Sequence, residues 1–274
     1  MGTSNRSNGP NRSPLLPPDF NLEDLELGNP NEENNSGMQE PENDKNKDLE
    51  QKVTWQSAKS SMTRYVRGAG TSPNRPISNY VKASGGSKNI TRSSGGAVRS
   101  TVALGSFINQ VKNSSFREAV ESLGFQFEGK NTEDILIFLA EELSPNPSDK
   151  EDAVARTAMI ETLSDLYDEL DQSNEGIEKL NQINQDTLSS LIVKYIINYI
   201  YERILSELGK RFEDGADSSE EAVAKEIEVK DYITAVVETS QKMRDVITYD
   251  FKSSGILSFV ASTFIECYSI LENL

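Results

Sequence analysis

The residues that most often carry enzyme chemistry are almost missing from this sequence. The chain has no histidine and a single cysteine, Cys267. It therefore lacks the commonest general base and the commonest zinc ligand, and a serine nucleophile would have to use a lysine or a carboxylate as its base. Cys267 lies in the apolar run "STFIECYSIL", which is typical of buried packing. We expect a chain that is not an enzyme and needs no metal or cofactor.

Carboxylates are the one abundant group that could do chemistry. In the run "DLYDELD", four of them fall within about two turns of a predicted helix and could hold a hard cation: Asp165, Asp168, Glu169 and Asp171. A solvated acidic helix face is the simpler interpretation, because the glycine-containing loop of an EF-hand is not present. The glycine pairs in "GGSKNIT" and "SSGGAVRS" lack the preceding apolar strand of a phosphate-binding loop.

Charge is distributed unevenly along the 274 residues, whose net charge is −16. Residues 1–50 hold 11 acidic and 4 basic residues, and residues 51–100 hold 9 basic residues and no acidic one. Residues 101–274 hold 33 acidic and 15 basic residues. The middle block is thus a basic segment between two acidic ones. Its cations and aromatic residues could track a phosphate backbone and stack on bases, or contact an acidic partner or the chain's own acidic part; the candidates are Trp55, Arg64, Tyr65, Arg67, Arg75, Tyr80 and Lys82.

The first 50 residues are rich in Asn, Pro, Ser, Gly and Glu and have no sustained apolar period, which predicts a disordered leader. Within it, "SPLLPPDFNLEDLEL" could be a short docking motif through Leu15, Leu16 and Phe20. Local collapse without a partner is the alternative. A flexible leader of about 50 residues has an r.m.s. reach of roughly 35–40 Å.

Apolar spacing predicts helices through the rest of the chain. In 51–97 it gives two short basic helices, ended near Gly68 and Gly85, and then a Gly/Ser linker. Residues 98–274 read as successive amphipathic helices, with Asn131 and Ser218 as N-cap candidates. We therefore predict an all-α fold: a bundle of six or seven helices in 98–274, preceded by a disordered leader at 1–50 and a basic segment at 51–97.

No segment is expected to cross a membrane. The two most apolar stretches, "LSSLIVKYIINYIY" and "ILSFVASTFIECYSIL", are shorter than the roughly 20 residues that a span requires, and Lys194 and Glu266 interrupt them. No secretory signal is visible at the N-terminus. The single cysteine excludes a disulfide framework, so the sequence predicts a soluble cytoplasmic protein.

The order of several short motifs resembles a known family. "MGTSNRSNGP", "SPLLPP", "WQSAKSSMTRYV", "ISNYVKASGGS", "SSGGAVRSTVALGSFINQV" and "SDKEDAVARTAMIETLSDL" follow one another as in the QatB component of the bacterial Qat anti-phage defence system. The resemblance implies a non-enzymatic subunit that works with a P-loop ATPase, a QueC-like enzyme and a TatD-like nuclease. It also implies modification of Gly2 by the QueC-like enzyme, with Thr3, Ser4 and Gly9 as recognition context.

Modification at Gly2 would be chemically reasonable. An α-amino group has a pKa near 7.7–8.0, so a useful fraction is neutral and nucleophilic at cellular pH. N-myristoylation is disfavoured, because its motif needs Ser or Thr where this chain has Arg6. An unmodified terminus is the plain alternative. Two functions thus stay open: an interaction subunit of a defence complex, and a nucleic-acid-binding adaptor acting through residues 52–99.

Overall fold

The computed structural model describes residues 53–171, 180 and 183–273, and every regular element in these ranges is helical, as predicted. The elements are α1 (Trp55–Arg64), η2 (Tyr65–Ala69), α2 (Asn74–Ala83), α3 (Gly86–Arg92), α4 (Gly95–Asn113), α5 (Phe116–Ser122), α6 (Thr132–Glu142), α7 (Lys150–Asp171), α9 (Gln185–Leu208), α10 (Lys210–Glu213), α11 (Ser219–Val237), α12 (Gln241–Val246) and α13 (Ile256–Asn273).

Local signals place many of the helix ends. Asn131 begins α6 through a capping box, in which its side chain accepts from the Asp134 N–H at 2.8 Å and the Asp134 carboxylate accepts from the Asn131 N–H at 2.9 Å. Ser218 caps α11 by accepting from the Glu221 N–H at 3.1 Å. The short π-helix η2 is interrupted at Gly68, whose φ of 72° lies in the left-handed region that glycine adopts without steric cost.

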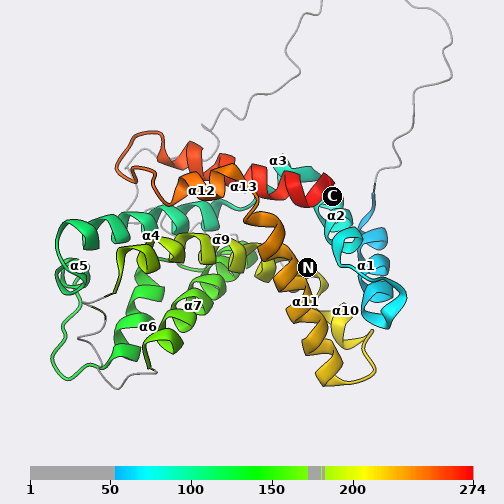
Figure 1. Ribbon diagram of the computed structural model, residues 1–274, viewed down its shortest axis with the longest axis horizontal. Coiled ribbons are helices and arrows are strands. Elements are labelled where there is room, and N and C mark those ends of the chain that lie inside the picture. The colour runs from blue at the N-terminus through cyan, green and yellow to red at the C-terminus, as the bar shows by residue number, and fades with distance from the viewer. Residues whose placement is uncertain (1–52, 172–179, 181–182, 274) are drawn as a thin grey trace, which may run out of the picture.

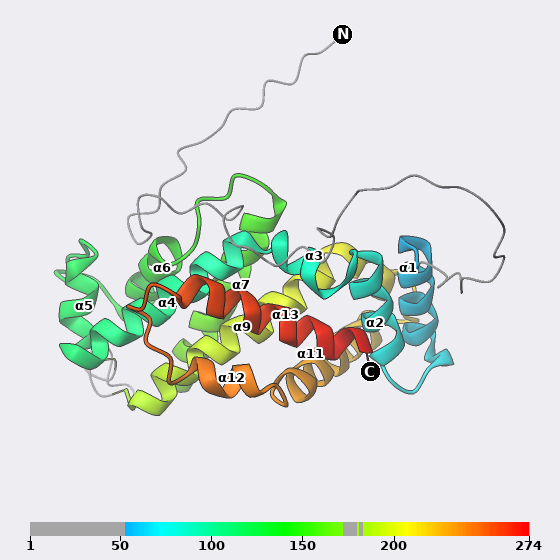
Figure 2. The ribbon, with the colours of Figure 1, turned by 90° about the horizontal axis from the view of Figure 1, so that it is seen from above.

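Helix α9 occupies the centre of the molecule. It packs against α7 and α4 along one part of its length and against α11 along another, while α13 crosses above and reaches α2, α3, α4 and α11 (Figures 1 and 2). Half of the side chains of α9 are buried, and several of them, such as Tyr195, Ile196 and Tyr199, have no exposure at all. The apolar stretches around α9 and α13 are therefore core helices. In the described residues, no helix is long and apolar enough to cross a membrane.

Two short helices were not foreseen. Six or seven helices were predicted within 98–274, and the described residues there form seven longer or clearly patterned helices together with the short α10 and α12. The amphipathic run from Glu220 to Ile247 is divided between α11 and α12, because the first helix ends before Ser240. This serine is buried, donates to the Glu266 carboxylate at 2.6 Å and accepts from the Met243 N–H at 3.3 Å, so it caps a new helix.

The expected Gly/Ser linker is also helical. Residues 86–92 form α3, and α4 already begins at Gly95. The chain can leave α2 and turn into α3 because Gly85 and Gly86 both have φ near 90°, at 92° and 84°. Helices α1 to α3 share one buried core with the rest of the described chain, through residues such as Ala58, Met62 and Ile77. The leader, with Gly2, Thr3, Ser4, Gly9, Leu15, Leu16 and Phe20, lies outside the described residues.

Candidate functional site

The aromatic residues of the basic segment are mostly core residues. Tyr65 and Tyr80 are 2% and 1% exposed, so neither ring can stack on a base, and that prediction for them is wrong. These residues do share helix faces, as their spacing predicted, but the faces are turned toward α10 and α13 and, at Tyr65, toward α11 rather than toward solvent. Trp55 is 39% exposed and meets Tyr80 edge-on, with 5.7 Å between ring centroids.

The basic segment contacts the chain's own acidic part. The Tyr65 hydroxyl donates to the Glu228 carboxylate of α11 at 2.5 Å, and Lys225 Nζ lies 5.0 Å from the centre of the Tyr65 ring. The Glu272 side chain of α13 accepts from the Ser87 N–H at 3.1 Å. These contacts agree with the second interpretation of the basic segment, packing on its own acidic helices.

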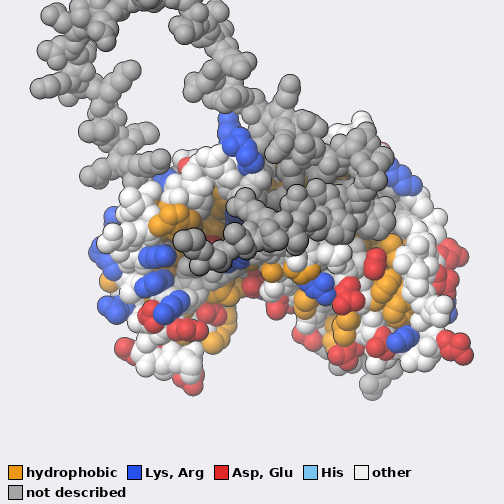
Figure 3. Space-filling view, turned by 180° about the vertical axis from the view of Figure 1, so that it is seen from behind, with side chains coloured by type: hydrophobic (Ala, Val, Ile, Leu, Met, Phe, Trp, Pro, Cys, Tyr) orange, Lys and Arg blue, Asp and Glu red, His pale blue; other side chains and the backbone are white. Residues whose placement is uncertain are grey.

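The cations of the basic segment remain on the surface. Arg64, Arg67, Arg75 and Lys82 are all exposed, and Figure 3 shows Lys and Arg side chains gathered at one end of the molecule. Arg64 and Arg75 line one pocket of about 430 Å³ between α1 and α2, which we call the basic pocket. Arg67 and Lys82 do not line it. The structure thus brings together two of the four predicted cations.

A second pocket, of about 480 Å³, lies where α4, α7 and α9 meet, and it borders what we call the buried polar cluster: Ser94, Gly96, Glu151, Tyr199 and Arg203. The Glu151 carboxylate accepts from the Gly96 N–H at 2.9 Å and from the Tyr199 hydroxyl at 2.8 Å. Arg203 donates to the Tyr199 hydroxyl at 2.6 Å and to Ser94 Oγ at 2.7 Å. Glu151 therefore caps the N-terminus of α4 from another helix.

Burial is the main cause of the pKa shifts of Glu151 and Tyr199 in this cluster. Desolvation raises the pKa of Glu151, while the hydrogen bonds from Tyr199 and Gly96 and the charge of Arg203 oppose the shift. Desolvation also raises the pKa of Tyr199 well above its ordinary value. The hydrogen bonds and the positive N-terminal end of α4 are what hold a carboxylate in this place.

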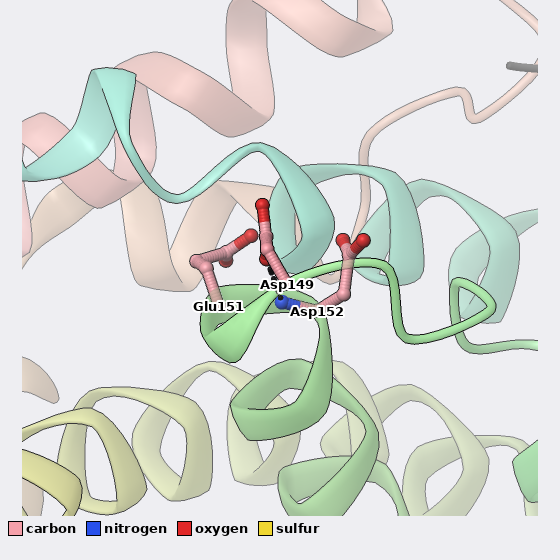
Figure 4. A group of neighbouring side chains, drawn as sticks. All are labelled: Asp149, Glu151 and Asp152. Carbon is pink, nitrogen blue, oxygen red and sulfur yellow. Dashed lines mark hydrogen bonds between the residues drawn. The ribbon is translucent and has the colours of Figure 1, made fainter. Parts of the chain in front are cut away.

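Three carboxylates crowd the start of α7. One oxygen from each of Asp149, Glu151 and Asp152 lies within 4.8 Å of the others, and Figure 4 shows the three side chains around the first turn. Asp149 accepts from the Asp152 N–H at 2.9 Å, the dashed line in that figure, and Asp152 accepts from Arg99 at 3.0 Å and Ser148 Oγ at 2.6 Å. Helix capping and ion pairing explain the group without a metal ion.

Cys267 is fully buried, and burial raises the pKa of its thiol, as expected for a packing residue. Asp165 and Asp168 lie on α7, and Asp168 is exposed, which is consistent with a solvated acidic face. The side chains of Glu169 and Asp171 lie outside those the structure describes.

A family model identifies the protein family to which this chain is related. The model of the family described as "Qat anti-phage system associated protein QatB" matches residues 85–271, which is more than half of the chain. The chain belongs to the QatB family. Neither the comparison with curated proteins nor the comparison with solved structures gave a match.

The two pockets differ in their position relative to the range matched by the QatB family model. All residues of the buried polar cluster fall inside the matched range, whereas Arg64 and Arg75 of the basic pocket precede it. Glu151, Tyr199 and Arg203 were not predicted, because the contacts that join them into a cluster mostly link residues 48 to 109 positions apart in the chain. The one signal that could have found them was the run of small residues "SSGG", which lets α7 approach the start of α4: a Cβ on Gly96 would lie 2.7 Å from Glu151 Oε2.

Proposed function

We propose that this QatB-family chain is a non-enzymatic interaction subunit of its anti-phage system. It docks a P-loop ATPase partner and presents the Gly2 amine to a QueC-like enzyme, in a system that also holds a TatD-like nuclease. Family membership supports the placement in the Qat system. The observation that carries the docking role is a notch between two lobes of the helical body, whose walls bear exposed apolar side chains.

Figure 3 shows this notch from behind, and the ribbon in Figure 1 places α6 and α7 on one side of the molecule and α10 and α11 on the other. Both α7 and α11 pack on α9, which lies between them. On α11, Val223, Glu226, Ile227 and Lys230 have the i, i+3, i+4, i+7 spacing of one helix face. Lys230 Nζ lies 5.5 Å from the Tyr201 ring centre of α9, so this face borders the notch.

The helices on both sides of the notch carry exposed apolar side chains and carboxylates. Val223 and Ile227 on one wall are 54% and 55% exposed, and Ile160 of α7 is 47% exposed next in sequence to Glu161. Burial raises the pKa of Glu202, and the neighbouring carboxylates of Glu161 and Glu226 add to the shift while Lys230 opposes it. The notch therefore presents apolar side chains together with an excess of carboxylate.

A basic amphipathic helix of the partner fits this surface best. Its cations would neutralise Glu161, Glu202 and Glu226, and its apolar face would cover Ile160, Val223 and Ile227. The chain's own leucine-rich segment is a poor occupant, because "DFNLEDLEL" carries four carboxylates and no cation. We therefore assign the notch to a partner protein rather than to the leader.

Replacing Glu202 with Gln should stabilise the protein at neutral pH. Because the folded pKa of Glu202 is raised above 4.5, this group's contribution to stability is complete below that value and is lost as pH rises through the folded pKa. Glutamine stays neutral, so the gain in Tm should be clear at about pH 7 and disappear near pH 4. Thermal unfolding across this range measures it, with exposed Glu142→Gln as the control. An equal gain at every pH would contradict the charge explanation.

Co-expression with the other Qat components tests the proposed function. The wild-type chain should co-purify with the ATPase, and Ile227→Asp should reduce the yield of complex at least tenfold, because it adds a charge to the apolar wall of the notch. Ile227→Leu preserves the apolar surface and Thr248→Asp adds the same charge to another exposed position, so both should bind normally. Normal binding by Ile227→Asp would remove the notch as the docking face, and failure of the wild-type chain to co-purify would remove the docking role itself.

Intact-mass measurement of the same preparations tests whether the Gly2 amine is modified. With the QueC-like enzyme present, the wild-type chain should carry an added mass that Gly2→Val abolishes, since a branched side chain hinders access to the α-amine. Gly9→Val, which changes another leader glycine, should be modified as the wild type is. An unmodified Gly2 terminus in every preparation would refute this part of the proposal.

A further inference from the structure

Six cations in residues 98–273 form ion pairs, whereas none of the described cations in the basic segment does. In the rest of the described chain, ion pairs link Arg99 to Asp152, Arg117 to Glu121, Lys150 to Glu207, Arg156 to Glu141, Arg211 to Asp214 and Lys225 to Glu228. Among the described residues, Arg64, Arg67, Arg75 and Lys82 have no carboxylate within salt-bridge distance. The sequence explains part of this difference, because residues 51–100 contain no Asp or Glu.

Two of these free cations face a surface made of hydroxyl groups. Helix α1 turns Gln56, Ser57, Ser60, Ser61 and Arg64 toward the basic pocket, at the i, i+1, i+4, i+5, i+8 spacing of a single face. Arg75 and Asn79 of α2 line the opposite side, with Ser72 and Gly70 from the connection between the helices. Among residues 53–273 that the structure describes, no carboxylate lines the pocket. Its volume of about 430 Å³ falls in the range of small-molecule sites.

We propose that the basic pocket binds a phosphate group, carried by a nucleotide or by single-stranded nucleic acid. An arginine guanidinium offers paired N–H donors that match phosphate oxygens, and two arginines on facing helices can hold one phosphate from both sides. Ser57 and Thr54 share one hydrogen bond at 3.2 Å between their hydroxyl oxygens, which leaves one hydroxyl proton for a ligand.

Because the whole chain has a net charge of −16, long-range attraction cannot draw a phosphate ligand to the basic pocket. Residues 101–274 carry a net charge of −18, so a long polyanion is repelled from most of the surface. Binding must then come from short-range contacts at the end of the molecule where the cations gather (Figure 3). This requirement fits a single phosphate or a few nucleotides better than an extended duplex.

Paired substitutions in the full-length protein separate the pocket from general charge. Arg64→Ala with Arg75→Ala removes two cations that line the pocket, and Arg67→Ala with Lys82→Ala removes two cations of the same segment that do not. The probes are ATP by calorimetry and a fluorescent dT₁₀ oligonucleotide by anisotropy, across a salt series. Circular dichroism checks that both variants fold, and Ser60→Glu, which puts a carboxylate in the pocket, replaces the first variant if it does not.

We expect the pocket variant to weaken binding at least tenfold and the control variant less than threefold. If the oligonucleotide is the ligand, the pocket variant should also reduce the slope of log K against log salt by about 0.7 for each phosphate that the protein no longer neutralises. An effect on ATP alone identifies a nucleotide as the ligand. Equal losses in both variants, no binding of either probe, or equally strong competition by a poly-glutamate peptide would each overturn the proposal.

Discussion

Gly105→Ala should destabilise the fold by about 3 kcal/mol, as overpacking of a dense core does. A Cβ built on Gly105 of α4 would overlap the Phe251 ring at Cε1, much closer than any van der Waals contact. The Phe251 ring is 6% exposed and packs into the core, so moving it away from α4 would disturb the packing of its neighbours. For a chain of this size we expect Tm to fall by roughly 6–12 °C, measured by calorimetry or circular dichroism.

Two comparisons isolate the clash. Gly255 lies in the same region of the chain as Phe251, but a Cβ there would meet only Tyr249 Oη at 3.5 Å, so Gly255→Ala should change stability by less than about 0.5 kcal/mol. Adding Phe251→Leu to Gly105→Ala should make the double variant less destabilised than the sum of the single ones, because the same contact is relieved. A Tm for Gly105→Ala equal to that of the wild type would show that α4 and Phe251 pack differently.

Glu151→Ala should cost about 3–5 kcal/mol, the usual effect of removing one member of a buried charged network. The substitution leaves the N–H groups of Gly96 and Ala97 and the Tyr199 hydroxyl without their acceptor. It also leaves the Arg203 guanidinium without its neighbouring carboxylate. Because the cluster joins α4, α7 and α9, we expect a lower midpoint in chemical denaturation and faster hydrogen exchange at the start of α4.

An exposed ion pair nearby provides the matched control. Lys150 Nζ lies 2.6 Å from Glu207 Oε1, but both side chains are more than a third exposed, at 60% and 39%. Glu207→Ala should therefore cost at most about 1 kcal/mol. If Glu151→Ala and Glu207→Ala had similar small effects, Glu151 would not be the acceptor that holds the start of α4.

The candidate site could be predicted only in part. The carboxylate-free block drew attention to Arg64 and Arg75, and both line the basic pocket. The same reasoning predicted that Tyr65 and Tyr80 could stack on nucleic-acid bases, but both side chains are buried. Helical periodicity shows that residues share a face, but whether that face meets solvent or another helix depends on partners far away in the chain.

The sequence by itself determined the all-helical class, the long helices and several of their ends. Asn131, Ser218 and Gly68 act through residues within four positions of themselves, so their effects can be read from the local sequence. Only the tertiary structure decided the position of Glu151, whose carboxylate caps α4 by accepting from the N–H of Gly96, 55 residues earlier. It also decided the break at Ser240, which depends on Glu266 of α13. Contacts of this kind follow from how the helices pack, and no local pattern specifies them.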